Sequence, residues 1–365
     1  MSKRHIAIIA GARPNFMKVG PLMKQLANSS FRATLIHTGQ HYDAKMSDIF
    51  FTQLDIPKPD VSLGVGSGTH AEQTGKVMMA FESYCNEARP DLVVVVGDVN
   101  STLACSLVAA KANIPVAHLE AGLRSRDWTM PEEINRLVTD RLSALLLTPS
   151  QDADENLLAE GASRDSIHFV GNAMIDTLLS LMEKIDGVEI LPSLEVEPRQ
   201  YAVGTFHRPA NVDSEEKLTQ LTELWRKISE IIPLVLPLHP RSKAMIGRFG
   251  LLPSLEKANL RIIDPLGYLE FTHLNKNARF VITDSGGVQE ETTVLGIPCL
   301  TYRENTERPV TITHGTNILV GTDPVRAFEA VGEVLEREMP VASAPPLWDG
   351  KTAERCVAVF EDFLG

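Results

Sequence analysis

Short apolar runs alternate with amphipathic stretches along almost the whole chain, and this alternation constrains the fold more than any other feature. The run LVVVV at residues 92–96 is apolar throughout, which is typical of a parallel strand buried on both faces. In the first half, strands are predicted at His5–Ala10, Ala33–His37, Asp91–Val96, Pro115–Leu119, Ala144–Thr148 and Ile167–Val170. Amphipathic helices are predicted between them, among others at Pro14–Ala27, His70–Ala88 and Ser101–Ala112. This order predicts an α/β fold with a doubly wound parallel sheet.

The pattern is interrupted at residues 186–199 and then resumes. The segment DGVEILPSLEVEPR has two prolines, several acids and no clear period, so we interpret it as a linker. Further strands are predicted at Tyr201–Thr205, Pro233–Leu238, Arg261–Ile263, Arg279–Thr283 and Pro298–Tyr302. A length of 365 residues also favours two domains. We predict two Rossmann-like domains, residues 1–185 and 186–350, with a ligand cleft between them. A C-terminal helix within residues 351–365 is expected to pack back across the domain junction.

The charge balance excludes some classes of partner. With 35 Lys and Arg against 47 Asp and Glu the formal net charge is −12, which disfavours nucleic acid or an anionic membrane surface. No apolar run approaches the roughly 20 residues that span a bilayer. The N-terminus is interpreted as a first strand and not as a signal peptide. The four cysteines lack CxxC or zinc spacing, so we expect reduced core thiols in a cytoplasmic protein and no metal site.

The turn GARPNFMK, residues 11–18, joins the first predicted strand to the first helix. Such a turn directs backbone N–H groups and the positive end of the helix toward whatever lies above the sheet. Because Arg13 adds a cation there, a diphosphate is a natural occupant, although Arg13 could instead pair with a carboxylate. No segment after a predicted strand has the pattern GxGxxG. A dinucleotide site of the usual kind is therefore disfavoured.

Three carboxylates are expected to meet at one edge of the first sheet. Asp98 and Glu120 each follow a predicted strand, and Glu132 lies at the start of a helix. Taken singly, each could be structural, since acids cap helices and are favourable at helix N-termini. Together they would repel one another, which raises pKa values and suits proton transfer. The candidate compensating cations are Arg124, Arg126 and Arg136.

The second half carries a candidate phosphate site. In VITDSGGVQEE, residues 281–291, a predicted strand runs into two glycines and a helix begins at once. Free N–H groups, a hydroxyl and the absence of side chains together favour a phosphate cradle, although an ordinary glycine turn is the alternative. Glu290 or Glu291, about one helical turn further on, could accept hydrogen bonds from ribose hydroxyls. His207 and His239 each end a predicted strand, where a lone histidine is more often structural.

In this order, the motifs resemble the non-hydrolysing UDP-N-acetylglucosamine 2-epimerases, which belong to the glycosyltransferase-B structural class. The resemblance runs from GARPNFMK through GD, HLEAGLRS, PEEINR, FHRP and TDSGGVQEE to NTERP and TNILVG. It implies that the catalytic residues are Asp98, Glu120, Glu132 and His207. It implies that UDP and its phosphates are bound by Arg13, Lys18, His239, Ser285, Gly286, Gly287, Glu291 and Arg308. Bacterial members often have GTRPE in the first turn, where this chain has Asn15 in place of the acid.

The resemblance also implies an activity. It is the reversible epimerisation of UDP-N-acetylglucosamine to UDP-N-acetylmannosamine, by anti elimination of UDP to a 2-acetamidoglucal and re-addition, with no cofactor and no metal. Three alternatives remain open. The first is a 2-epimerase of a diacetamido-uronic acid nucleotide, since a GARP-type opening also occurs in such relatives. The other two are a UDP-sugar glycosyltransferase and a hydrolysing epimerase. The family's habit implies a homodimer.

Overall fold

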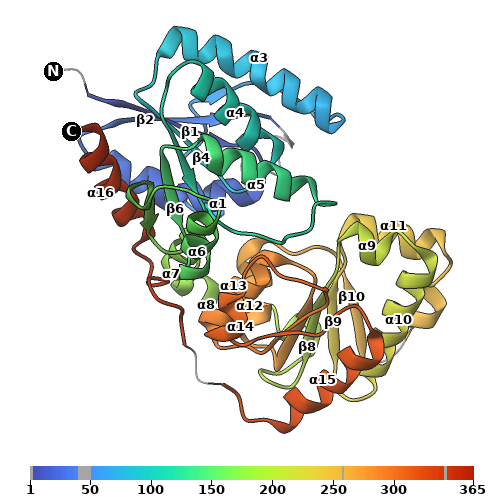
Figure 1. Ribbon diagram of the computed structural model, residues 1–365. Helices are drawn as coiled ribbons and strands as arrows, with labels where there is room; N and C mark the ends of the chain where they lie inside the picture. The colour runs from blue at the N-terminus through green and yellow to red at the C-terminus, as the bar shows by residue number, and fades with distance from the viewer. Residues whose placement is uncertain (1–2, 40–50, 257–258, 341–342) are drawn as a thin grey trace. The chain divides into compact units, whose positions relative to one another are not determined.

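The chain is described from a computed structural model over residues 3–39, 51–256, 259–340 and 343–365 (Figure 1). By its internal contacts it divides into two compact units. Unit 1 consists of residues 1–180 and 346–365, and unit 2 of residues 181–345. The corresponding predicted boundaries lie at 185/186 and 350/351. In each unit helices alternate along the chain with the strands of a parallel sheet, which confirms the predicted fold class of two Rossmann-like domains.

The sheet of unit 1 has the strand order β3-β2-β1-β4-β5-β6-β7, with every neighbouring pair parallel. Its strands are β1 (His5–Ala10), β2 (Arg32–His37), β3 (Val61–Ser62), β4 (Leu92–Val96), β5 (Val116–Leu119), β6 (Leu145–Thr148) and β7 (Ile167–Phe169). Its helices are α1 (Arg13–Ala27), α3 (His70–Ala88), α4 (Asn100–Lys111), α5 (Pro131–Leu142), α6 (Gln151–Ala159), α7 (Ala173–Ser180) and α16 (Thr352–Leu364). The strand order reverses between β1 and β4, and open sheets of this kind bind ligands beyond the carboxyl ends of the strands at that point.

Strand β4 lies in the middle of this sheet because its residues can be buried on both faces. All five of its residues are buried, as the run LVVVV predicts. Val93 and Val95 belong to a core cluster that includes Ile9 of β1 and Phe81 of α3. Strands β4 and β5 pair with Val96 opposite Leu119. The residues that follow these two strands therefore leave the sheet side by side.

The last helix of the chain completes unit 1. Helix α16 packs against α1 and α7 (Figure 1). The carboxylate of Asp176 accepts hydrogen bonds from the backbone N–H groups of Thr352 at 3.1 Å and Ala353 at 2.8 Å, at the N-terminus of α16. Just before the helix, the indole Nε1 of the buried Trp348 donates to the carbonyl oxygen of Pro149 at 2.8 Å.

The sheet of unit 2 has the strand order β10-β9-β8-β11-β12-β13 and is also parallel. Its strands are β8 (Ala202–Thr205), β9 (Leu234–Pro237), β10 (Leu260–Ile263), β11 (Phe280–Thr283), β12 (Cys299–Thr301) and β13 (Asn317–Leu319). Its helices are α8 (Met182–Asp186), α9 (Pro209–Val212), α10 (Glu215–Ser229), α11 (Pro240–Arg248), α12 (Tyr268–Lys276), α13 (Gly286–Leu295), α14 (Val310–Thr313) and α15 (Pro324–Glu336). Strands β8 and β11 pair with Thr205 opposite Thr283, so two chain segments again leave the sheet together.

The described part of the chain contains no helix that is both long and apolar enough to cross a membrane. Among the same residues, no group of three or more His, Cys, Asp or Glu side chains could hold a metal ion. The four cysteines are buried and unpaired, as predicted.

Candidate active site

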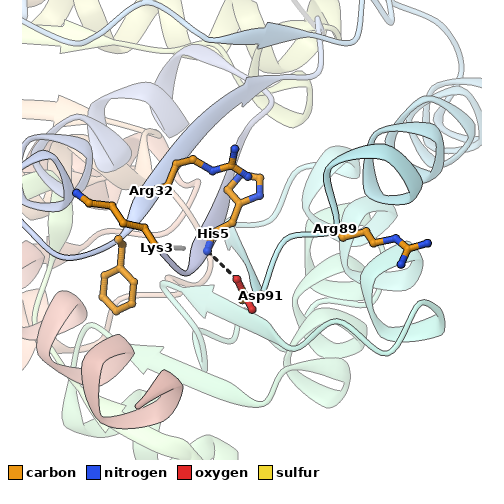
Figure 2. A pocket seen from close by; sticks show the side chains of 6 residues that line it. Lys3, His5, Arg32, Arg89 and Asp91 are labelled. Atoms are coloured by element: carbon orange, nitrogen blue, oxygen red, sulfur yellow. Dashed lines mark hydrogen bonds between the residues drawn. The ribbon is translucent and has the colours of Figure 1, made fainter. Parts of the chain in front are cut away.

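A cavity of about 570 Å³ opens at the amino-terminal edge of the unit 1 sheet (Figure 2). Its lining residues are Lys3, His5, Phe31, Arg32, Arg89 and Asp91. His5 begins β1 and Asp91 precedes β4, so this is the edge opposite to the one where the predicted carboxylates lie. None of the predicted site residues is among those that line it. Because parallel sheets bind ligands beyond their carboxyl ends, the candidate active site is at that other edge.

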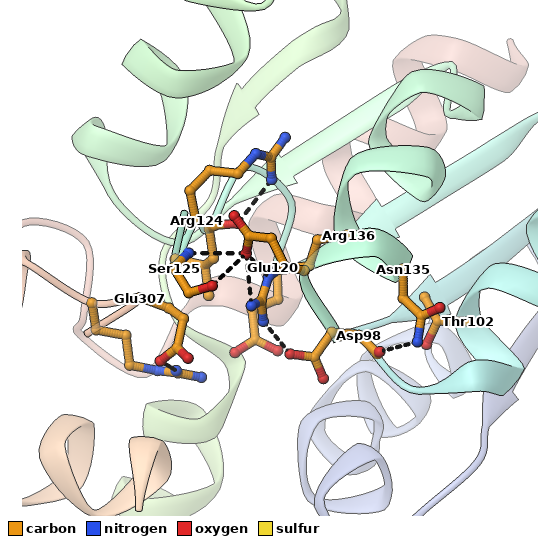
Figure 3. Close-up of polar contacts among 12 residues, drawn as sticks. Asp98, Thr102, Glu120, Arg124, Ser125, Asn135, Arg136 and Glu307 are labelled. Atoms are coloured by element: carbon orange, nitrogen blue, oxygen red, sulfur yellow. Dashed lines mark hydrogen bonds and ion pairs between the residues drawn. The ribbon is translucent and has the colours of Figure 1, made fainter. Parts of the chain in front are cut away.

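Asp98 lies in the turn between β4 and α4 and is held by α5. The guanidinium of Arg136 forms an ion pair with the Asp98 carboxylate, and Asn135 Nδ2 donates to the Asp98 carbonyl oxygen at 2.8 Å (Figure 3). The Arg136 side chain is buried, whereas that of Asp98 is 35 % exposed. A carboxylate that is oriented by a buried cation and still open to solvent can exchange a proton with a ligand.

Glu120 directly follows β5 and forms an ion pair with Lys18 of α1. Its backbone φ is +76°, a left-handed conformation that is uncommon for a residue other than glycine. The backbone N–H groups of Glu120 and Ala121 both donate to the carbonyl oxygen of Leu147, at 3.0 and 3.1 Å. A Cβ placed on Gly97 would lie 3.3 Å from Glu120 Oε2. The Glu120 carboxylate therefore lies against the turn between β4 and α4.

Glu132 and Glu133 are neighbours at the start of α5 but have different surroundings. Glu133 is buried and accepts hydrogen bonds from the backbone N–H groups of Ser125 and Arg126, both at 2.9 Å, and from Arg136 Nη2 at 2.9 Å. Burial opposes ionisation of Glu133, but these donors outweigh it and lower its pKa. Glu132 is half-buried, and its side chain has no hydrogen bond or ion pair with any described residue. Glu133 therefore orders the loop, and Glu132 has a carboxylate available to a ligand.

Of the three arginines that were candidates to compensate the catalytic carboxylates, only Arg136 pairs with one of them within the described residues. Arg136 pairs with Asp98, but Arg124 Nη2 lies 2.7 Å from both Asp140 and Glu160. Arg126 donates to Asn156 at 2.8 Å. The cation beside Glu120 is Lys18, which the family resemblance predicts to bind UDP. Its role as a UDP ligand stays a prediction.

The first turn is organised by Asn15. Its Oδ1 accepts the backbone N–H groups of Gly11 at 3.1 Å and Ala12 at 2.9 Å, and its Nδ2 donates to the carbonyl oxygen of Val96 at 3.1 Å. A carboxylate could accept the first two bonds but could not donate the third. Arg13 is the first residue of α1, but its side chain lies outside the described residues, so its role at a phosphate also stays a prediction.

In unit 2, His207 is oriented by a buried carboxylate. Asp284, which follows β11, accepts hydrogen bonds from the backbone N–H groups of His207 at 3.1 Å and Arg208 at 3.0 Å. Its Oδ1 lies 3.1 Å from His207 Nδ1. Burial opposes ionisation of Asp284, but the hydrogen bonds and charge of His207 and the hydrogen bond from Asn211 lower its pKa. The His207 side chain is 44 % exposed, so its outer nitrogen can reach a ligand.

The glycine turn lies beside an arginine. Ser285 precedes α13, whose first two residues are Gly286 and Gly287. A Cβ placed on Gly286 would lie only 2.7 Å from Nη1 of Arg308. The Arg308 guanidinium is held there by Glu290, with Nε and Oε1 2.7 Å apart. The structure thus brings Ser285, both glycines and Arg308 together, as an anion site requires.

Glu291, the predicted ribose ligand, is buried in α13. The hydroxyl of Tyr268 donates to its Oε1 at 2.8 Å. Burial, together with the neighbouring charge of Glu290, raises the pKa of Glu291 to about 7, although the Tyr268 hydrogen bond acts in the opposite direction. His239, by contrast, is exposed at the N-terminus of α11, where its Nδ1 accepts the backbone N–H of Arg241 at 3.2 Å.

Asp284 and Tyr268 were not predicted as site residues from the sequence. Asp284 could have been predicted, because it directly follows a predicted strand. Asp98, which was predicted, also lies just after the end of a predicted strand. Tyr268 follows an irregular segment and precedes its partner by 23 positions, so no local pattern indicates it. Each contact described above lies within one unit.

Unit 1 carries carboxylates at the carboxyl edge of its parallel sheet. Unit 2 carries a glycine turn with basic neighbours at the carboxyl edge of its own sheet. These features define an enzyme of the glycosyltransferase-B structural class. Residues 24–361 match the family described as UDP-N-acetylglucosamine 2-epimerase. The chain therefore belongs to the UDP-N-acetylglucosamine 2-epimerase family.

Several relatives are similar over nearly their whole length. UDP-N-acetylglucosamine 2-epimerase of Methanocaldococcus jannaschii is 42 % identical over 97 % of this chain and 98 % of its own. Its crystal structure in complex with UDP-GlcNAc and UDP matches with a TM-score of 0.90 at 41 % identity, over 98 % of this chain and 99 % of that one. UDP-2,3-diacetamido-2,3-dideoxy-D-glucuronate 2-epimerase of Pseudomonas aeruginosa is also 42 % identical, over 87 % of this chain and 88 % of its own.

Proposed function

We propose that the chain interconverts UDP-N-acetylglucosamine and UDP-N-acetylmannosamine by elimination and re-addition of UDP. Membership of the family and the M. jannaschii relative support this activity. The observation that carries the mechanism is the placement of Asp98 and Glu120 at one sheet edge, each paired with its own cation. Glu132, whose side chain has no hydrogen bond or ion pair within the described residues, is the third proposed catalytic carboxylate.

The chemistry explains why carboxylates are needed. The C2 hydrogen of an N-acetylhexosamine is not acidic, so direct deprotonation is unfavourable. When the anomeric C–O bond to UDP breaks, positive charge at C1 acidifies C2–H, and a carboxylate takes the proton. UDP leaves with the bonding electron pair, and a C1–C2 double bond remains in 2-acetamidoglucal. Protonation of C2 on the opposite face and return of UDP to C1 give the epimer. Two faces require two proton-transfer groups, and Asp98, Glu120 and Glu132 are the candidates.

The second unit supplies the proposed site for UDP. The N–H groups at the start of α13, with Ser285 and Arg308, would stabilise the diphosphate as it leaves. His207, oriented by Asp284, would donate a hydrogen bond to the same group. The predicted UDP ligands Arg13, Lys18, His239 and Glu291 belong to this proposal as well. The reaction is redox-neutral and requires neither nicotinamide nor a metal ion.

A second candidate substrate is a UDP-diacetamido-uronic acid. The P. aeruginosa relative named for such a sugar has the same 42 % identity as the M. jannaschii relative. The two substrates differ at C3 and C6 and share the C2 chemistry, so the proposed carboxylates would serve either. A homodimer located in the cytoplasm completes the proposal, and light scattering would test the dimer.

Proton NMR of the protein with UDP-N-acetylglucosamine in D2O tests the activity. We expect UDP-N-acetylmannosamine with deuterium at C2, because re-protonation draws on solvent. Free N-acetylmannosamine with UDP would instead indicate a hydrolysing epimerase. A parallel sample with the diacetamido-uronic acid nucleotide measures substrate preference. If neither nucleotide exchanges its C2 hydrogen, the proposed activity is refuted.

Asp98→Asn tests the catalytic assignment. We expect kcat to fall by about 100-fold or more, because a proton-transfer group is lost, while the Kd for UDP stays within about twofold. Deuterium incorporation at C2 and titration calorimetry with UDP measure the two quantities. The matched control is Asp165→Asn, which neutralises an exposed carboxylate outside the site and should leave both unchanged. Weaker UDP binding with unchanged turnover at saturation would contradict the assignment.

A further inference from the structure

His118 lies in β5, two residues before Glu120, and its side chain is fully buried. Its Nε2 is 2.8 Å from the carbonyl oxygen of Gly97, and its Nδ1 is 2.5 Å from Oδ1 of Asp140 on α5. The Gly97 carbonyl belongs to the peptide that precedes Asp98. One imidazole ring therefore contacts the backbone of the Asp98 turn and a carboxylate on the helix that carries Glu132.

Asp140 extends this contact to the turn of Glu120. Its Oδ2 accepts the backbone N–H of Gly122 at 3.1 Å and lies 2.7 Å from Nη2 of Arg124. Burial opposes ionisation of Asp140, but the charges and hydrogen bonds of His118 and Arg124 outweigh it and lower its pKa. Asp140 is therefore a carboxylate that accepts hydrogen bonds at both oxygens.

Both nitrogens of the His118 ring thus face acceptors. A carbonyl oxygen has no hydrogen to donate, and neither has a carboxylate. A neutral imidazole donates from one nitrogen only, so the other would direct its lone pair at an oxygen. The contacts are satisfied when both nitrogens carry hydrogen. The ring is then a buried cation, and Asp140 supplies the opposite charge that such a cation needs.

The two turns that His118 joins are conformationally unusual. Glu120 and Gly97 have φ values of +76° and +65°, and Gly122 has +82°. A Cβ placed on Gly122 would lie 2.5 Å from the carbonyl oxygen of Ala153, so this turn is also closely packed. A residue other than glycine keeps a left-handed conformation only where its surroundings hold it there. At Glu120 those surroundings include the chain of contacts from Gly122 through Asp140 to His118.

We propose that His118 is a positioning residue that fixes the Asp98 and Glu120 turns relative to each other through its doubly donating, cationic ring and Asp140. The inference rests on the proposed epimerisation, in which Asp98 and Glu120 are two of the three candidate groups for proton transfer at C2 of the sugar. His118 is fully buried and so touches no substrate. It acts through the backbone of Gly97 and through Asp140.

The kinetic test is His118→Gln. The neutral amide cannot place hydrogens toward both Gly97 and Asp140 in the ring's geometry, so one turn is released. We expect kcat to fall about 100-fold, since a displacement of about 1 Å in a reacting group has an effect of that order. The KM for UDP-N-acetylglucosamine and the Kd for UDP should stay within about twofold, because the proposed UDP ligands lie mainly in unit 2.

The matched control is His168→Gln on β7 of the same sheet, which should keep kcat within about twofold. A folded His118→Gln variant with kcat within threefold of the wild type overturns the proposal. The wild-type protein is assayed alongside. If the wild type does not epimerise its substrate, the proposed function fails. If the wild type and the variant are equally active, only the proposed role of His118 fails.

A second test needs no variant and so remains decisive if His118→Gln fails to fold. Protein labelled with 15N and 13C in histidine is studied by long-range proton–nitrogen correlation at neutral pH, with the ring assigned through the backbone of β5. We expect both ring nitrogens of His118 to carry hydrogens that exchange slowly with solvent. A single protonated nitrogen would overturn the proposal.

Discussion

The side-chain amide of Asn15 accepts two hydrogen bonds and donates a third. It accepts two backbone N–H groups of its own turn and donates one bond to the carbonyl oxygen of Val96, at the end of β4. An aspartate at this position would have nearly the same shape. It would keep the accepted bonds but would direct an oxygen at the Val96 carbonyl. One side chain therefore couples the turn between β1 and α1 to the strand that leads to Asp98.

Asn15→Asp should lower the free energy of unfolding by about 1–3 kcal/mol, the usual effect of leaving a buried acceptor unsatisfied. Urea denaturation measures the change. The matched control is Asn86→Asp, which makes the same substitution at an exposed position of α3 and should change stability by less than about 0.5 kcal/mol. Equal effects of the two substitutions would show that the bond to Val96 contributes nothing.

Glu291 predicts a pH dependence of stability. Its pKa is about 7 in the folded chain, against an ordinary value of 4.5. Between these two values the folded chain holds a proton that the unfolded chain has lost, so the free energy of unfolding falls as the pH rises through this window. This contribution is fully present below pH 4.5 and is lost above pH 7.

Glu291→Gln removes the ionisation while keeping an acceptor for the Tyr268 hydroxyl. We expect variant and wild type to be equally stable near pH 4.5. At pH 8 the variant should be more stable by about 3 kcal/mol, from about 1.4 kcal/mol per pKa unit. Urea denaturation between pH 4.5 and 8 measures both curves. Parallel curves would mean that the carboxyl group of Glu291 titrates normally in the folded protein.

Helix α13 begins with two glycines, and their surroundings differ. A Cβ on Gly286 would meet the Arg308 guanidinium at 2.7 Å, so Gly286→Ala must displace that guanidinium from the turn. We expect the Kd for UDP to rise about 10-fold or more, the effect of weakening one charge-assisted hydrogen bond. Titration calorimetry measures it. Gly332→Ala in α15, where a Cβ meets nothing within 4 Å, is the control and should leave UDP binding unchanged. Unchanged affinity in Gly286→Ala would remove Arg308 from the proposed site.

At the level of elements, the sequence predicted most of the two sheets. The strand expected at Ala33–His37 begins one residue earlier, at Arg32, and the final helix Thr352–Leu364 lies within the residues 351–365 where a helix was predicted. The edge strands β3 (Val61–Ser62) and β13 (Asn317–Leu319) were not predicted, although the similarly short edge strand β7 was predicted within Ile167–Val170. A strand of two or three residues is too short to show a period of its own, so its prediction depends on the residues that flank it.

The same limit applies to the candidate site. The positions of Asp98 and Glu120 at one sheet edge follow from where two apolar runs end. The partner of Glu120 does not, because Lys18 lies 102 positions earlier in the chain and is brought there by the pairing of β1, β4 and β5. His118 was likewise indistinguishable from an ordinary strand residue, since its two acceptors come from different elements.

At the level of the whole chain, each unit has its own buried core and its own buried tryptophan. Trp225 of α10 packs in unit 2 against Phe206, with ring centroids 5.5 Å apart. Trp348 belongs to unit 1, to which the chain returns after completing unit 2. A substitution should therefore destabilise the unit in which the residue is packed, wherever that residue lies in the sequence. A substitution near the C-terminus should thus destabilise unit 1, which is built mainly from the N-terminal half of the chain.

Trp348→Phe tests this dependence. It removes the indole N–H that donates to Pro149 at 2.8 Å and leaves a buried carbonyl unsatisfied, so unit 1 should lose about 2 kcal/mol. In urea, circular dichroism should detect an earlier loss of helix. With the third tryptophan, the exposed Trp128 of unit 1, replaced by Phe in every protein compared, the fluorescence of Trp225 should still change at the wild-type urea concentration, because that residue then reports on unit 2 alone. Trp225→Phe is the reciprocal control, in which unit 2 unfolds earlier and Trp348 reports an unshifted unit 1. If both probes shift together in either variant, the two units unfold as one cooperative body, and the C-terminal helix stabilises the whole chain and not unit 1 alone.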